Sequence, residues 1–182
     1  IGGAGAEEGV TSVYTEFLVR SYKVTPTSEI RDKTVAAIEA SFRPNRVFIN
    51  RIRHGDKSIT EAEGSSGITE GDEVLVSARR NVLLPIERHF GTEVDDRELM
   101  DVPEENVDVV VTNKQIVGRT VKEIAESSTA REEGRGVFVK KFMRGGVEMP
   151  LKAGMQVDRG DVLTLVGAHN DVERVIEAIG YA

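Results

Sequence analysis

The sequence contains an internal repeat, which restricts the possible folds more than any other feature does. The stretch 68–91 aligns with 157–180 at a constant offset of 89 residues. Two further blocks upstream align in the same order, 47–55 with 137–145 and 29–41 with 115–127. Three blocks that keep one order and differ only in loop length are not expected by chance. The chain is therefore predicted to hold two copies of one module.

The second copy predicts the order of elements within the module. A β-branched run at 107–112 is typical of a strand, and Thr120 with Glu123 has the capping-box pattern of a helix start. The expected elements after this helix are a polar loop at 126–136, strands at 136–144, 147–151 and 161–167, and a helix from Asn170 to Gly180. Each module is therefore expected to be β-α-β-β-β-α.

Arg159-Gly160-Asp161 has the letters of a cell-adhesion tripeptide, but the repeat predicts a structural role. Its counterpart in the first copy is Glu70-Gly71-Asp72, in which only Gly-Asp persists. The recurring pair is typical of a turn glycine and an acidic residue that lead into a buried strand.

A module of about 75 residues has little core of its own, so pairing two modules is the expected solution. We expect an α+β fold in which two tandem β-α-β-β-β-α modules pack as a pseudo-twofold pair. The expected divisions are a flexible terminus at 1–11, the first module at 12–91, a solvated acidic linker at 92–104 and the second module at 105–182.

Three segments of the second copy carry a family resemblance: IVGRTVKEI, GVFVKKFMRGGVEMPL and GDVLTLVGAHNDVERV. They resemble the TrkA C-terminal domain, the C-terminal half of regulators of K+ conductance (RCK-C). The first copy fits more loosely, because His54-Gly55-Asp56 stands in place of Arg144-Gly145-Gly146 and Asp32 in place of Gly118. The resemblance covers about 150 of the 182 residues.

A narrower resemblance lies in 93–124, above all in the string Val-Asp-Val-Val-Val-Thr-Asn at 107–113, and in the closing AIGYA. These segments are similar to the large cytoplasmic loop of the aspartate:alanine exchanger family, which are bacterial membrane antiporters. The resemblance implies a loop at the cytoplasmic face of the inner membrane, whose partner is the transmembrane domain of the same polypeptide. A loop excised from such a protein would account for a chain that starts at Ile1 and has no apolar run long enough to span a bilayer.

Composition and motifs argue against several function classes. The net charge of −7 does not suit a partner with a phosphate backbone, so no nucleic acid polymer is expected. The chain has no cysteine, and no nucleophile–base arrangement is readable, so we expect no enzyme. The glycine-rich stretch 2–9 lacks the third glycine of a dinucleotide fingerprint, and His54, His89 and His169 lack metal-ligand spacing. We therefore expect neither a cofactor nor a metal.

Basic residues before the turn in each copy form the candidate ligand site. They are Arg51, Arg53, Lys140, Lys141 and Arg144. Cations clustered in an acidic chain suit a small anion such as an amino acid or a nucleotide, which we place at the module interface. The resemblance adds that some RCK-C domains bind nucleotides, including cyclic di-AMP, between two modules. The alternative is that these cations are solvated strand edges that discourage aggregation.

The sequence thus favours a non-catalytic regulatory or ligand-sensing domain of a bacterial transporter, with an aspartate:alanine antiporter as the expected parent and a homodimer as the expected state. Two alternatives remain open. One is a structural oligomerisation module of the transporter. The other keeps the regulatory role but assigns the domain to a K+ or anion transporter.

Overall fold

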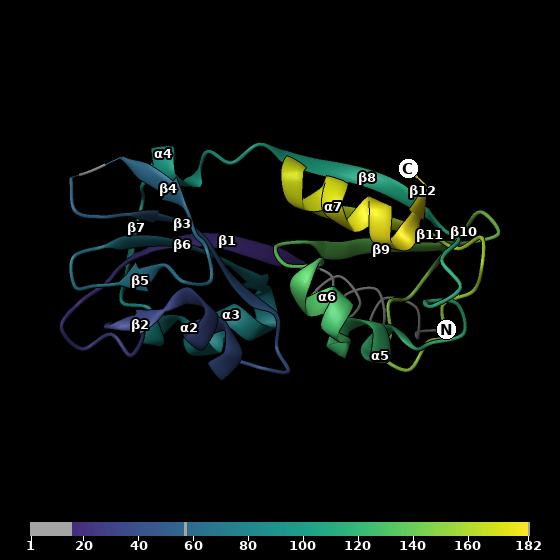
Figure 1. Ribbon diagram of the computed structural model, residues 1–182, viewed down its shortest axis with the longest axis horizontal. Helices are drawn as coiled ribbons and strands as arrows, with labels where there is room; N and C mark the ends of the chain where they lie inside the picture. Colours follow the sequence, from purple (N-terminus) through teal and green to yellow (C-terminus); the bar gives the residue numbers. More distant parts are fainter. Residues whose placement is uncertain (1–15, 57, 182) are drawn as a thin grey trace, which may run out of the picture. The chain divides into compact units, whose positions relative to one another are not determined.

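The computed structural model describes residues 16–56 and 58–181. It divides into two compact units, one comprising Phe17–Val102 and the other including the chain from Pro103 onward (Figure 1). The predicted flexible terminus at 1–11 lies outside the described residues. Because each unit has its own sheet and core, each is described by itself.

The first unit is built on a five-stranded antiparallel sheet in the order β4-β3-β6-β1-β7. These strands are β1 Phe17–Lys23, β3 Val47–Arg53, β4 Ile59–Glu61, β6 Glu73–Arg79 and β7 Thr92–Val94. The other elements are β2 Lys33–Thr34, paired with β5 Gly67–Ile68, and the helices α2 Val35–Ser41, α3 Arg80–Ile86, 3-10 helix η1 Glu87–His89 and α4 Arg97–Met100.

The second unit repeats this plan with a five-stranded antiparallel sheet in the order β10-β9-β11-β8-β12. Its strands are β8 Glu104–Val111, β9 Phe138–Arg144, β10 Val147–Met149, β11 Val162–Ala168 and β12 Gly180–Tyr181. Its helices are α5 Val121–Glu126, α6 Ser128–Glu132 and α7 His169–Ile179. The mixed class with antiparallel sheets is therefore confirmed, while the pairing of the modules about a pseudo-twofold axis stays a prediction.

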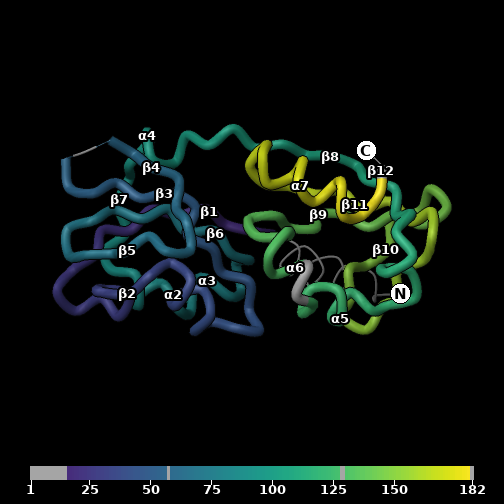
Figure 2. Tube along the Cα trace, viewed as in Figure 1, coloured from purple at the N-terminus to yellow at the C-terminus, as the bar shows by residue number. Residues whose placement is uncertain are grey.

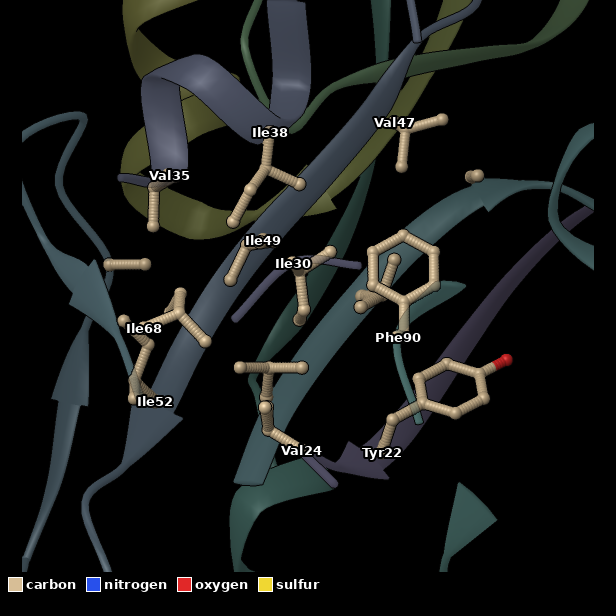
Figure 3. Packing of buried hydrophobic residues seen from close by; sticks show 14 of the residues in the cluster. Tyr22, Val24, Ile30, Val35, Ile38, Val47, Ile49, Ile52, Ile68 and Phe90 are labelled. Atoms are coloured by element: carbon tan, nitrogen blue, oxygen red, sulfur yellow. The ribbon is translucent and has the colours of Figure 1, made fainter. Parts of the chain in front are cut away.

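The core of the first unit lies between one face of its sheet and the helices α2 and α3. Val35 and Ile38 of α2 and Leu83 of α3 are fully buried in one apolar cluster with strand residues. Figure 3 shows part of this cluster, in which the rings of Tyr22 and Phe90 stack at 5.5 Å between centroids. The helices α2 and α3 thus cover one face of the sheet. We call the opposite face, to which Arg51 and Arg53 point, the outer face.

A β-bulge at the same place in each unit decides which side chains reach the outer face. Asn50 is the extra residue of β3 against β6, because the register shifts between Ile49 and Arg51. The bulge breaks the alternation, so that Ile49 and Ile52 both join the core (Figure 3) while Arg51 and Arg53 point outward. In the second unit the extra residue is Lys140 of β9, against β11.

Helix boundaries test the capping predictions. The Thr120 hydroxyl accepts from the Glu123 amide and the Glu123 carboxylate accepts from the Thr120 amide, so the predicted capping box is confirmed. The start of the last helix at Asn170 was predicted wrongly, since α7 begins at His169 with Ala168 as its N-cap. The reason is that β11 runs directly into α7 without a loop in which Asn170 could cap.

The polar stretch 126–136 was also predicted wrongly as a loop throughout, because it holds α6. The Ser127 hydroxyl accepts from the Ala130 amide at 3.2 Å, which satisfies one of the free amides at the start of this short helix.

Candidate functional site

The five candidate cations divide between the two units. Arg51 and Arg53 lie on β3 of the first unit, and Lys140, Lys141 and Arg144 lie on β9 of the second. In both strands the bulge aims alternate side chains at the outer face. The contacts of each cation determine whether it is available to a ligand.

Arg53 is occupied by carboxylates of its own unit. Its Nε donates to Asp96 Oδ2 at 2.8 Å and its Nη2 to Asp96 Oδ1 at 3.2 Å, which makes a bidentate pair. The same Nη2 donates to Glu98 Oε2 at 3.0 Å. Only 19% of the Arg53 side chain and 13% of the Asp96 side chain are exposed. A ligand anion at Arg53 would therefore have to displace Asp96 and Glu98.

These carboxylates come from the stretch 92–104, expected to be a solvated acidic linker. Most of it is instead packed on the first unit. β7 pairs with β1, and α4 lies against β1, β3 and β6 with Leu99 fully buried. The many acidic residues predict a solvated segment. Only one buried apolar side chain and one cluster of ion pairs hold it in place, and this signal is too weak to read from the sequence.

We call residues 95–101 the strap. Asp96 caps α4 at its start, since its Oδ1 accepts from the Leu99 amide at 3.0 Å. At the other end, Arg51 Nη1 donates to the Asp101 carbonyl at 3.0 Å and its Nε to Glu61 Oε1 at 2.7 Å. A surface depression of about 580 Å³ is lined by Asp95, Arg97, Glu98, Met100 and Asp101. Both arginines of β3 therefore bind groups of the strap, and neither offers a vacant site to a ligand anion.

Glu73 adds a second carboxyl beside Asp96 and lies directly across the sheet from Arg53. The hydrogen bonds from Arg53 hold the pKa of Asp96 down at about 2, against its burial. Burial, and then the neighbouring Asp96, raise the pKa of Glu73. The two carboxyls are thus pushed in opposite directions, which is the pattern of a pair with one strongly ionised member.

Asp96→Asn should lower the free energy of unfolding of the first unit by about 2 kcal/mol at pH 7, whereas Glu73→Gln should leave it unchanged or raise it. Because the pKa of Asp96 is depressed, its contribution is present above about pH 4 and is lost as the pH falls toward about 2. The raised pKa of Glu73 means that its ionised form opposes folding at neutral pH. Hydrogen exchange of the β3 and β6 amides measures both effects, and equal destabilisation by the two variants would contradict this assignment.

Arg144 is likewise engaged within the second unit. Its Nε and Nη2 donate to the two carboxylate oxygens of Asp161, each at 2.8 Å, and Nη2 also donates to the Gln156 carbonyl at 2.9 Å. Asp161 is buried and accepts from the Asp158 amide at 2.6 Å. Burial alone would raise the pKa of Asp161, but the bonds from Arg144 and Asp158 more than offset it, so that the pKa is lowered.

The equivalent acid of the first unit has the same role. Asp72 is buried, and its Oδ2 accepts from the Thr69 amide at 2.8 Å and lies 3.0 Å from His54 Nδ1. His54 thus stands where Arg144 stands in the second copy. The predicted structural role of the repeated Gly-Asp is confirmed. In both copies the carboxylate accepts a hydrogen bond from a backbone amide three residues earlier, which closes the turn, and a buried strand begins at the next residue.

Lys140 and Lys141 are the least restrained of the five candidates. Both are exposed. Lys141 Nζ lies 3.7 Å from Glu148 Oε2, and Lys140 Nζ donates to Asn106 Oδ1 at 3.3 Å. Exposed ammonium groups with such long or neutral contacts can exchange them for a ligand anion at little cost. These two lysines therefore remain the most accessible part of the candidate site.

The residues that sequence reasoning missed are those of the strap, above all Asp96 and Leu99, together with Glu73. The sequence did offer one signal, an Asp followed three residues later by the apolar pair Leu99-Met100, which is compatible with a capped helical turn. Within 16–56 and 58–181, no group of His, Asp and Glu side chains could hold a metal ion. The same described ranges contain no helix that is long and apolar enough to cross a membrane.

No protein-family model matches the chain. The chain is 33% identical over 181 residues to an uncharacterized transporter of Bradyrhizobium diazoefficiens, covering 99% of the chain and 34% of that protein. It is 31% identical over 180 residues to an uncharacterized transporter of Shewanella oneidensis, covering 97% of the chain and 31% of that protein. The chain therefore spans about a third of the length of these curated relatives.

Among solved structures, the chain is similar to two RCK domains at low scores. One is the RCK C domain of the potassium transport protein KtrA in complex with c-di-AMP, with a TM-score of 0.35 and 21% identity over 47% of this chain and 93% of that chain. The other is the GsuK RCK domain, with a TM-score of 0.36 and 10% identity over 90% of this chain and 64% of that chain. In sequence, the chain is similar over nearly its whole length to one segment of longer proteins described as transporters.

Proposed function

We propose that the chain is a non-catalytic regulatory domain of a bacterial membrane transporter, which acts at the cytoplasmic face of the inner membrane on the transmembrane domain of its own polypeptide. The observation that carries this proposal is the similarity of 99% of the chain to about a third of a transporter. A shared segment of that extent, with two units of one topology, suits a device that senses a ligand and transmits a change between the units.

The finer parts of the proposal rest on the sequence. The string at 107–113 favours an aspartate:alanine exchanger as the parent, and the repeat favours two modules at 12–91 and 105–182 that pair about a pseudo-twofold axis within one chain. The expected state of the chain is a homodimer. The ligand is a small anion, either an amino acid or a nucleotide. Lys140 and Lys141 are its accessible contacts, because Arg51, Arg53 and Arg144 already hold groups of their own unit.

Calorimetry of this chain with aspartate, alanine, nucleotides and cyclic di-AMP tests the ligand. We expect one anion to bind and the double variant Lys140→Ala, Lys141→Ala to weaken its affinity at least about tenfold. The double variant Lys122→Ala, Lys152→Ala removes the same charge from exposed positions outside β9 and should bind as the wild type does. If nothing binds, and sedimentation shows a dimer without ligand, the domain is a structural oligomerisation module instead.

A further inference from the structure

The strap is short and is held to the first unit at few points. Its helix α4 has only four residues, and a single turn is not stable on its own. Leu99 is fully buried, whereas the side chain of Arg97 is 91% exposed and that of Glu98 is 77% exposed. Segments with few buried apolar contacts open at a lower free energy than the core does.

The polar contacts of the strap converge on two arginines of one strand. Arg53 donates hydrogen bonds to Asp96 and Glu98 at the start of the strap, and Arg51 donates one to the Asp101 carbonyl at its end. Asp96 also caps α4, so that one carboxylate both closes the helix and binds the sheet. Loss of Arg53 would therefore weaken the docking and the helix together, so the strap is expected to dock and to release as one piece.

Because the strap lies between the two units in the sequence, its release lengthens the free chain that joins them. β7 ends at Val94 and β8 of the second unit begins at Glu104 (Figure 2). With the strap docked, only Val102 and Pro103 remain between it and β8. With the strap released, the free segment 95–103 can extend to about 30 Å.

We propose that the strap is a releasable clasp that sets the length of the tether between the two units. In the docked state the arginines of β3 keep the tether short. In the released state the units are joined by a flexible segment and their relative motion widens. The strap would act in this way whether or not the chain regulates a transporter.

Arg53→Met tests the clasp by hydrogen exchange. Met143 occupies the equivalent place in the second copy, so a strand at this position accepts methionine. We expect the Leu99 and Met100 amides, which donate to Asp96, to exchange at least about tenfold faster. The β3 and β6 amides lose some protection, because the ion pair also stabilises the whole unit, but they should stay far better protected than the strap amides. Arg31→Met removes the same charge from ion pairs with Asp32 and Glu70 elsewhere in this unit, and it should leave the strap unchanged.

The tether is measured directly by a pair of labels, since the chain has no native cysteine. Ser65→Cys and Ala153→Cys place one exposed label in each unit. Arg53→Met should broaden the distribution of distances between the labels toward longer values. Unchanged exchange at Leu99, or faster exchange without any change in this distribution, would overturn the proposal.

Asp96→Asn provides the second variant in case Arg53→Met unfolds the whole unit. Asparagine is as good an N-cap as aspartate, so this change removes the ion pair and retains the cap. We expect faster exchange in the strap and a broader distribution of label distances. A strap as protected as in the wild type would show that the arginine clasp does not hold it, and so would overturn the proposal.

Discussion

Arg144→Ala should destabilise the second unit far more than the removal of an exposed surface charge does. The change leaves the carboxylate of Asp161, which is 2% exposed, without its bidentate partner. A buried charge that loses its counterion is far more costly than the intact pair is stabilising, and the Asp158 amide alone cannot replace a guanidinium. Hydrogen exchange of the β9 and β11 amides reports the loss in this unit separately from the first.

Arg159→Ala is the matched control, because Arg159 is exposed and lies in the same turn sequence as Asp161. It should change the free energy of unfolding by less than about 0.5 kcal/mol. Arg144→Lys should recover only part of the stability, since an ammonium group cannot make two parallel hydrogen bonds to one carboxylate. Equal effects of Arg144→Ala and Arg159→Ala would show that the buried pair does not stabilise the unit.

Local sequence patterns predicted those parts of the fold that depend on neighbouring residues. The capping box at Thr120 and the short strand before Pro150 follow from residues within one turn of the chain, and both are present. The repeat predicts a longer-range feature, because the alignment alone makes Asp72 and Asp161 equivalent, and both are buried. Residues that recur in both copies, such as Gly-Asp, are those that the turn requires, whereas Arg159 is replaced by Glu70 and is not required.

The remaining features depend on contacts between distant segments. The bulges at Asn50 and Lys140 reverse the alternation of their strands, so a strict two-residue period assigns Arg51 and Lys141 to the wrong face. Asp96 acquires its role from Arg53, which lies 43 residues away in the sequence. For these reasons the sequence predicts the candidate cations but not the carboxylates that pair with them.

Gly180→Ala should destabilise the second unit by about 3 kcal/mol, because the chain approaches β8 too closely for a side chain. A Cβ at Gly180 would collide with the Val110 carbonyl oxygen and lie 3.0 Å from the Thr112 hydroxyl. Gly180 does end α7, as expected, but its φ of 168° is extended backbone open to any residue. The close approach, rather than a left-handed conformation, therefore requires glycine here.

The first copy tests the same reasoning independently. Gly91 is the repeat equivalent of Gly180, and a Cβ there would collide with the Lys23 carbonyl oxygen, at a φ of 135° that also disfavours alanine. Gly91→Ala should thus destabilise the first unit by at least as much. Gly154→Ala is the control, because its Cβ would meet nothing within 4 Å, and it should be neutral or slightly stabilising. If Gly180→Ala were as mild as Gly154→Ala under urea unfolding followed by hydrogen exchange, the close approach of Gly180 to β8 would not constrain this position.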